Sequence, residues 1–229
     1  MKPMPDSTAD RLASVLERRT AAAPAEWLRA RIEAAATSPA GNRADFIAAF
    51  SAAGRRLGPA PLLLEEADAL GAAARLVAGR GLDEVGRIAL LLARLGAIED
   101  HLALVQDLFY RGDAREKQAV LRALPLLPEP AQFLEIAVEA CRSSVQTVFE
   151  AIGCENPYPA DHFPDEAFNQ LVLKALFIQV RVARIDGLDR RTGSELLRMV
   201  DGYGNERRAA GRSVPEDIDR IHALVRRDR

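Results

Sequence analysis

Apolar residues recur at helical spacing through almost all of this 229-residue chain, and no segment alternates with a period of two for long enough to predict a strand. The segment 130–143 shows the pattern clearly. Its apolar residues fall at intervals of three and four and form one stripe: Phe133, Ile136, Ala137, Ala140 and Cys141. Turns rich in Gly and Pro separate such segments, so the sequence predicts an all-α fold of about ten antiparallel helices.

The helices are expected to be short and to follow one another closely. Asp6 or Ser7 is expected to cap the first helix, and Asn42 to precede the third. After less regular helices in residues 1–97, the predicted segments are about 98–110, 114–124, 130–143, 145–152, 164–180, 189–209 and 215–226. Stacked antiparallel pairs of this length are typical of HEAT and armadillo proteins, so we predict an irregular α-solenoid-like stack. We expect one all-helical domain over residues 1–229, with 98–229 as its more regular part.

Composition argues against several classes of function. A net charge of −2 and an aromatic content of 5% are unlike a nucleic-acid binder, which would present a basic face with interleaved aromatic residues. No apolar run reaches the length of a membrane-spanning helix, and the N-terminus has no signal-peptide pattern. The sequence therefore predicts a cytoplasmic protein without a membrane span.

Sequence motifs for cofactors and metals are also missing. The chain has no Gly-rich phosphate loop, GxSxG elbow or HExxH motif, so no cofactor and no metal site is predicted. Cys141 and Cys154 have no CxxC spacing, which fits free thiols in a reducing compartment. Cys141 lies on an apolar stripe, and Cys154 is expected to be the more accessible of the two thiols.

One stretch, NPYPADHFPDEAFNQLVLKALF at 156–177, differs from the Ala-, Leu- and Arg-rich remainder. Pro157 and Pro159 favour extended conformations in the residues before them, which predicts a long, stiff loop over residues 153–163. Pro164, followed by two acidic residues, then predicts the start of a helix. A rigid loop that leads into a helix start is well suited to present side chains.

The helix that follows is unusual because it is apolar nearly all round, which predicts a central, buried position. Gln170 and Lys174 nevertheless lie four residues apart on one of its faces, with Asn169 beside them. A buried lysine without a partner is costly or loses its proton. Lys174 must therefore reach solvent, pair with a carboxylate, or face a cavity.

Two interpretations of this segment remain open. In the structural one, Lys174 binds the C-terminus of a neighbouring helix or Glu166. In the functional one, the segment lines a pocket for a ligand with a polar or anionic head and an apolar body. The predicted ligand-binding residues are Tyr158, His162, Asn169, Gln170 and Lys174.

The same segment resembles the EboA family. The resemblance extends to ARIDGL at 183–188 and ERRAAGRSVPEDI at 206–218, and upstream to VLRALPLLP at 120–128, FLEIAVEACRSS at 133–144 and VFEAIGCENPYPA at 148–160. The N-terminal half resembles the family only in its helical character. GYG at 202–204 departs from the family pattern and leaves open a local helix break or close packing.

The resemblance implies a soluble accessory protein of a bacterial operon that traffics a small metabolite, prenylated or aromatic, towards the periplasm. It implies a binding or adaptor role without catalysis. The implied partners are other proteins of the same operon, a membrane prenyltransferase among them, and the metabolite itself. The family offers no catalytic residue to carry over to this chain.

Two alternatives to a metabolite-binding role stay open. One is a protein–protein interaction scaffold without a ligand. The other is an enzyme of unrecognised type acting on a small isoprenoid or aromatic metabolite. Its candidate proton-transfer groups are His162 with Asp161, His101 with Glu99 and Asp100, and Lys174.

Overall fold

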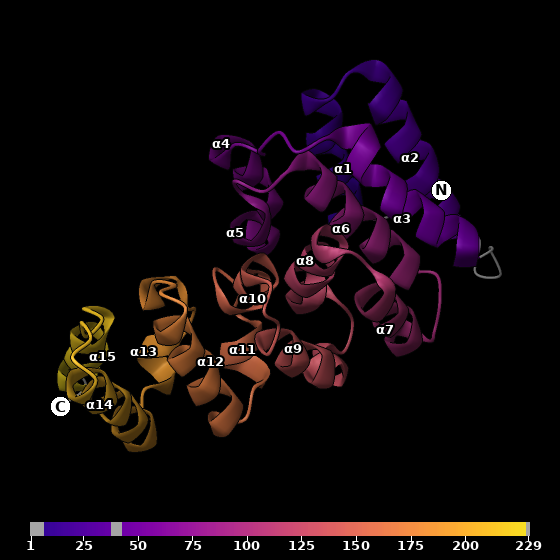
Figure 1. Cartoon of the computed structure of the whole chain (residues 1–229). Coiled ribbons are helices and arrows are strands. Elements are labelled where there is room, and N and C mark those ends of the chain that lie inside the picture. Colours follow the sequence, from indigo (N-terminus) through magenta and orange to yellow (C-terminus); the bar gives the residue numbers. More distant parts are fainter. Residues whose placement is uncertain (1–6, 38–42, 228–229) are drawn as a thin grey trace. The chain divides into compact units, whose positions relative to one another are not determined.

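The computed structural model describes residues 7–37 and 43–227, and these fold as helices joined by short turns (Figure 1). No strand occurs among them, although one isolated antiparallel bridge joins Pro61 and Gly81. The all-α prediction is therefore confirmed. The helices gather into two compact units, Met1–Ile136 and Ala137–Arg229.

The first unit contains eight α-helices within the described residues. They are α1 (Thr8–Arg19), α2 (Ala22–Thr37), α3 (Arg43–Leu57), α4 (Leu64–Ala67), α5 (Ala74–Val77), α6 (Leu82–Leu95), α7 (His101–Arg111) and α8 (Ala114–Ala123). Three 3-10 turns complete it, at Asp68–Ala73, Leu124–Leu126 and Pro130–Phe133. Ser7 caps α1 through a reciprocal capping box with Asp10, as predicted, whereas Asp6 and Asn42 lie outside the described residues.

Helix α6 is the centre of this unit, because α1, α2, α3 and α8 all pack against it. Even its charged residues Asp83 and Arg87 are buried, and they form an ion pair with 2.9 Å between Arg87 Nη1 and Asp83 Oδ2. A helix surrounded by four others is the arrangement of a bundle, whereas each repeat of a solenoid contacts only its neighbours. The predicted HEAT- or armadillo-like stacking is therefore not confirmed.

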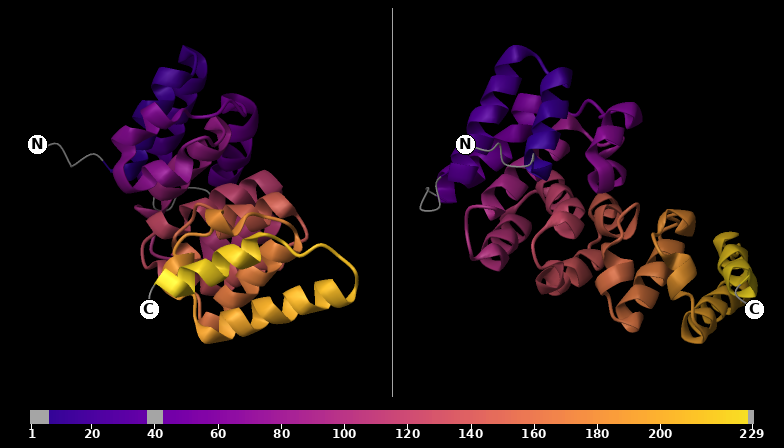
Figure 2. Two further views of the ribbon diagram at one scale, coloured as in Figure 1. Left: turned by 90° about the vertical axis from the view of Figure 1, so that its left-hand side faces the viewer. Right: turned by 180° about the vertical axis from the view of Figure 1, so that it is seen from behind.

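The second unit follows from within α9 (Leu134–Cys141). It contains α10 (Gln146–Gly153), α11 (Tyr158–His162), α12 (Asp165–Phe177), α13 (Leu188–Arg191), α14 (Ser194–Ala209) and α15 (Asp217–Arg227), with a 3-10 turn at Val182–Arg184. The last two helices lie side by side (Figure 2). Gly204 is buried where they meet, since a Cβ at this position would lie 3.4 Å from Ile218 Cδ1. Close packing therefore accounts for Gly204 alone, because Gly202 is exposed with no atom within 4 Å of its Cβ position, and α14 is unbroken.

Two predictions about the distinctive segment are wrong. Residues 153–163 are not one extended loop, because Tyr158–His162 forms the short helix α11. Pro157 and Pro159 lie at its N-terminal end, where the missing N–H groups cost no helical hydrogen bond. Nor is α12 buried all round: Phe168, Leu171 and Val172 are buried, but the side of α12 that carries Phe177 faces solvent.

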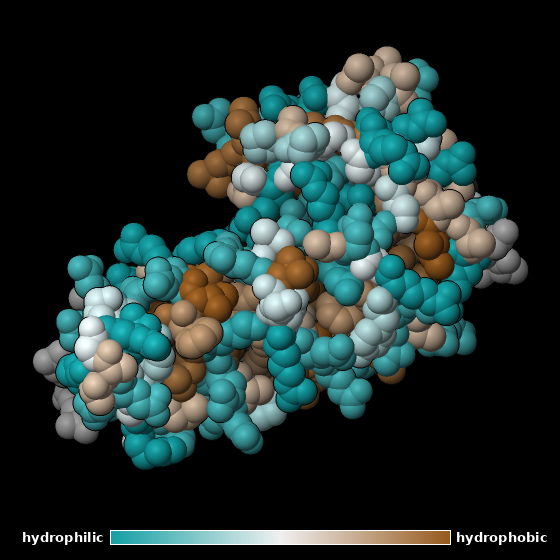
Figure 3. Space-filling model, in the orientation of Figure 1, coloured by the Kyte–Doolittle hydropathy of each residue, from teal (hydrophilic) through white to brown (hydrophobic). Residues whose placement is uncertain are grey.

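The surface is mostly hydrophilic on the face drawn in Figure 3. Among the described residues, the large hydrophobic side chains that are exposed are Leu63, Leu64, Tyr110, Val145 and Phe177. Phe177 is the most exposed of them, at 71%. No helix among the described residues has both the length and the apolar character needed to cross a membrane.

Candidate functional site

Helix α11 is held by the residues immediately before it. The side-chain amide of Asn156 donates to the carbonyl of Ala151 at 2.9 Å, and its Oδ1 accepts from the backbone N–H of Tyr158 at 3.0 Å. Asn156 is buried, so both ends of its amide are satisfied inside the protein. Asn156 therefore fixes the start of α11, and the proline pattern alone did not predict this role.

Arg191 of α13 fastens the connection between α11 and α12. Its guanidinium donates to the carbonyls of Ala160 and Phe163 at 2.7 and 2.8 Å, and to Asp165 Oδ1 at 2.9 Å. The guanidinium carbon also lies 4.9 Å from the centroid of the Phe168 ring. One cation thus satisfies the C-terminal end of a short helix and fixes Phe163 and the turn behind it.

Arg184 makes a second link to this segment. It donates to Glu155 through two nitrogens, at 2.6 and 3.0 Å, and to Glu150 Oε2 at 2.7 Å. The hydrogen bonds that Arg184 donates to Glu155 raise the pKa of Arg184 despite partial burial. For Glu150, burial favours the neutral acid, but hydrogen bonds from Arg184 and Gln146 outweigh it and lower the pKa. ARIDGL and the NPYP stretch, separate in sequence, are therefore parts of one structure.

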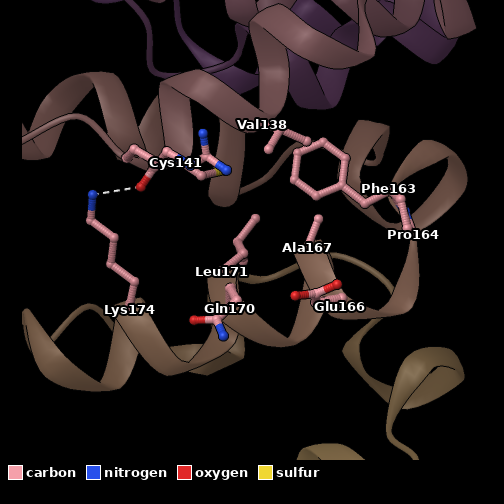
Figure 4. A pocket seen from close by; sticks show the side chains of 10 residues that line it. Val138, Cys141, Phe163, Pro164, Glu166, Ala167, Gln170, Leu171 and Lys174 are labelled. Carbon is pink, nitrogen blue, oxygen red and sulfur yellow. Dashed lines mark hydrogen bonds between the residues drawn. The ribbon is translucent and has the colours of Figure 1, made fainter.

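A pocket of about 600 Å³ opens between α9 and α12 in the second unit (Figure 4). Its apolar wall consists of Val138, Cys141, Phe163, Pro164, Ala167 and Leu171. Its polar side chains are Arg142, Glu166, Gln170 and Lys174. An apolar wall with a few polar groups at its margins is typical of a small-molecule site.

Lys174 both lines the pocket and caps α9. Its ammonium donates to the carbonyls of Cys141 and Ser143, with nitrogen–oxygen distances of 2.5 and 2.6 Å (Figure 4 draws the first). The nitrogen also lies 5.2 Å from the centroid of Phe149, and burial lowers the pKa of this lysine. The structural interpretation, in which Lys174 binds the C-terminus of a neighbouring helix, is therefore correct, and the same residue also lies on a pocket wall.

The five predicted ligand-binding residues fall into three places. Gln170 and Lys174 line the pocket. Tyr158 is fully buried, and burial raises the pKa of its hydroxyl. Its ring centroid is 4.6 Å from that of His162, which is half-buried. Neither residue is part of the pocket lining. Asn169 is buried and is not part of the pocket lining. Ligand binding by these five residues stays a prediction.

The lining also contains residues outside the five predicted ligand-binding residues. Four of them come from the same face of the distinctive segment as Gln170 and Lys174, namely Phe163, Glu166, Ala167 and Leu171. Two series with a spacing of four residues, 163/167/171 and 166/170/174, were a usable signal, because positions four residues apart share one side of a helix. Val138, Cys141 and Arg142 come from α9 and its end, and only the packing of α9 against α12 brings them here.

The two cysteines differ from expectation. Cys154 is completely buried, so the prediction that it is the more accessible thiol is wrong. Cys141 is buried as well but forms part of the pocket wall. Burial raises the pKa of its thiol to about 12, against the lowering effect of Lys174 and Arg142. The Cys141 thiol is therefore not activated as a nucleophile.

Alkylation with iodoacetamide, followed by mass spectrometry of the peptides, will measure the reactivity of the two cysteine thiols. At pH 8 we expect Cys141 of the native protein to react about a thousand times more slowly than an ordinary thiol, because its thiolate is that much scarcer. The rate should rise as the pH increases towards 12, and Cys154 should stay unlabelled. In denaturant both cysteines should react at ordinary rates. Native Cys154 reacting faster than Cys141 would contradict the burial described above.

Each of the three histidines contacts a nearby group; His101 and His162 are the two that were considered for proton transfer. His101 Nε2 lies 2.8 Å from the carbonyl oxygen of Ile98, just before the start of α7. His162 stacks on Tyr158, and His222 pairs with Asp201 at 2.8 Å. Over the residues that the structure describes, no three His, Cys, Asp or Glu side chains are grouped as metal ligands would be.

Fold and pocket together define an all-helical protein with an amphipathic pocket between two helices. The chain belongs to the EboA family: the family model described as "Metabolite traffic protein EboA" matches residues 8–223. The match includes most of the N-terminal half, which resembled the family only in helical character. No curated protein and no solved structure matches the chain.

Proposed function

We propose that this protein binds a small, largely apolar metabolite in the pocket between α9 and α12 and acts without catalysis in metabolite traffic. One observation carries the proposal: most of the pocket wall comes from residues 163–174, within the stretch that most distinguishes the sequence. The family's description as a metabolite traffic protein supports a role of this kind.

Size and chemistry of the pocket support the same proposal. A volume of about 600 Å³ lies in the range of sites for small organic molecules. Phe163 and Leu171 offer apolar contact, while Gln170 can both donate and accept a hydrogen bond. A prenylated or aromatic body fits a wall of this composition, and burying it would supply the main free energy of binding.

The wider role is part of the proposal. We infer that the chain acts as one domain in the cytoplasm of a bacterium and hands its metabolite to proteins of the same operon, a membrane prenyltransferase among them. In the second unit, irregular stacking of short antiparallel helices, in the manner of HEAT and armadillo proteins, would give such partners an extended surface. The family match supports the pathway, and the pocket supports the cargo.

The test uses N-phenyl-1-naphthylamine, a neutral apolar fluorophore whose emission rises when it leaves water. We expect it to bind one site per chain. Replacing Ala167 with tryptophan should fill the pocket and weaken binding at least about ten-fold, a loss of about 1.4 kcal/mol. Fluorescence titration of both proteins gives the dissociation constants.

The matched control is Ala209→Trp, since Ala209 is an exposed alanine of α14 that does not line the pocket. It should bind the fluorophore as the unchanged protein does. If Ala167→Trp folds normally by circular dichroism and binds equally well, the pocket is not the binding site and the proposal fails.

A further inference from the structure

The polar side chains of the pocket are arranged in order along α12. Glu166 lies in the first turn, Gln170 in the middle and Lys174 in the last turn. Figure 4 shows Glu166 near Phe163 and Pro164 at one end, and Lys174 reaching Cys141 at the other. Eight residues of helix separate Glu166 from Lys174, which is about 12 Å along the axis. The pocket therefore has two ends of opposite charge.

At the Lys174 end, hydrogen-bond donors remain available. An ammonium has three N–H donors, and Lys174 gives two of them to the carbonyls of Cys141 and Ser143. Its third N–H meets no acceptor within the part of the chain that the structure describes. The carbonyls fix the nitrogen in place, so its positive charge is positioned before any ligand arrives.

A second cation lines the same pocket close by. Arg142 follows directly after Cys141 and is exposed. Within the described residues, 7–37 and 43–227, it forms no ion pair. Both Arg142 and Lys174 lie near enough to the Cys141 thiol to act on it electrostatically. Two cations therefore gather at the C-terminal end of α9, while the one carboxylate of the lining, Glu166, lies towards the far end.

An anionic group would satisfy this end of the pocket. A carboxylate, sulfonate or phosphate ester could accept from both Lys174 and Arg142, and such charge-assisted hydrogen bonds are about twice as strong as neutral ones. The apolar wall at Cys141 and Leu171 keeps water away on one side, which strengthens the attraction. A cationic head would meet the two cations, and a neutral one would leave them without a partner.

We propose that the ligand of this pocket is an amphipathic monoanion, with its acidic group at Lys174 and Arg142 and its apolar body along Leu171 towards Phe163. The inference rests on the proposed function, because it names the class of molecule that the same pocket takes. The distance between the charged ends allows an apolar body of roughly 10 Å, the length of a two-ring aromatic or a geranyl chain.

Two fluorophores with the same apolar body separate charge from burial. 1-Anilinonaphthalene-8-sulfonate carries a sulfonate, and N-phenyl-1-naphthylamine lacks it. We expect the unchanged protein to bind the sulfonate about ten-fold more tightly, and Arg142→Met to reduce that preference to about two-fold, because one of two cations is gone. Binding of the neutral fluorophore should change little. Glu166→Gln should strengthen binding of the sulfonate, since it removes a like charge.

The control is Arg220→Met, which removes an exposed arginine of α15 outside the pocket and should leave both affinities unchanged. If neither fluorophore binds, the proposed function itself fails. If both bind equally, the pocket takes apolar ligands without reading charge, and only the anionic inference is overturned. A sulfonate preference that stays near ten-fold in Arg142→Met, or is lost in Arg220→Met, also overturns it.

Discussion

Replacing Arg191 with methionine is expected to lower the free energy of unfolding of the second unit by about 3 kcal/mol, the largest effect of any substitution proposed for this protein. The guanidinium is mostly buried, with 18% of its side chain exposed. Its loss leaves the carbonyls of Ala160 and Phe163 without their donor and removes a cation from the face of Phe168. The bond to Asp165 contributes little, because that side chain is 90% exposed.

The neighbouring arginine is a closely matched control. Arg190 pairs with Asp161, but both side chains are largely exposed, at 59% and 46%. Arg190→Met should therefore change stability by no more than about 0.5 kcal/mol. Urea denaturation followed by circular dichroism compares the two variants, and hydrogen exchange of the α11 amides shows where protection is lost. Equal destabilisation by both substitutions would show that Arg191 does not hold the α11–α12 connection.

The same substitution should also weaken ligand binding. Arg191 does not line the pocket, but it holds the carbonyl of Phe163, whose ring forms part of the pocket wall. Without denaturant, and at a temperature where Arg191→Met is fully folded, we expect N-phenyl-1-naphthylamine to bind the variant several-fold more weakly than the unchanged protein. Arg191 therefore acts as a positioning residue for the proposed site.

Local patterns in the sequence predicted the helices well. Intervals of three and four between apolar residues and the Ser7 cap correspond to α1, α6, α7, α8 and most of the later helices. Around α11 the prediction was wrong, because proline disfavours a helix in the residue before it but also fits the first turn of a new one. Asn156 Oδ1 accepts a hydrogen bond from the backbone N–H of Tyr158, and this contact favours the start of a helix over an extended loop.

The site was harder to predict than the helices. Gln170 and Lys174 could be placed on one face of α12 from their spacing alone. Which helix covers that face is decided by packing over about thirty residues of sequence, as the contact from Lys174 to Cys141 shows, and no local pattern encodes it. Tyr158 was chosen for its chemistry, yet it serves the core, where its ring packs edge-on against Phe163.

Lys174→Met provides the sharpest test of how structure and ligand share one residue. We expect it to lower the free energy of unfolding by about 2 kcal/mol, because two carbonyls at the end of α9 lose a charged donor and are left half-buried. It should also reduce the preference for the sulfonate fluorophore to about two-fold or less, since only one of the two cations, the exposed Arg142, remains.

Lys174→Arg separates the two roles of this residue. A guanidinium keeps the charge and can donate to the carbonyls of Cys141 and Ser143, so stability should recover by at least about half. Its fixed planar geometry aims the remaining donors differently from an ammonium, so recovery of sulfonate binding should be incomplete. Thermal unfolding and fluorescence titration of the three proteins distinguish these effects. If Lys174→Met is as stable as the unchanged protein yet loses sulfonate binding, Lys174 serves the ligand alone. If Lys174→Met loses stability but keeps sulfonate binding, Lys174 is a helix cap, and Arg142 alone makes the pocket selective for anions.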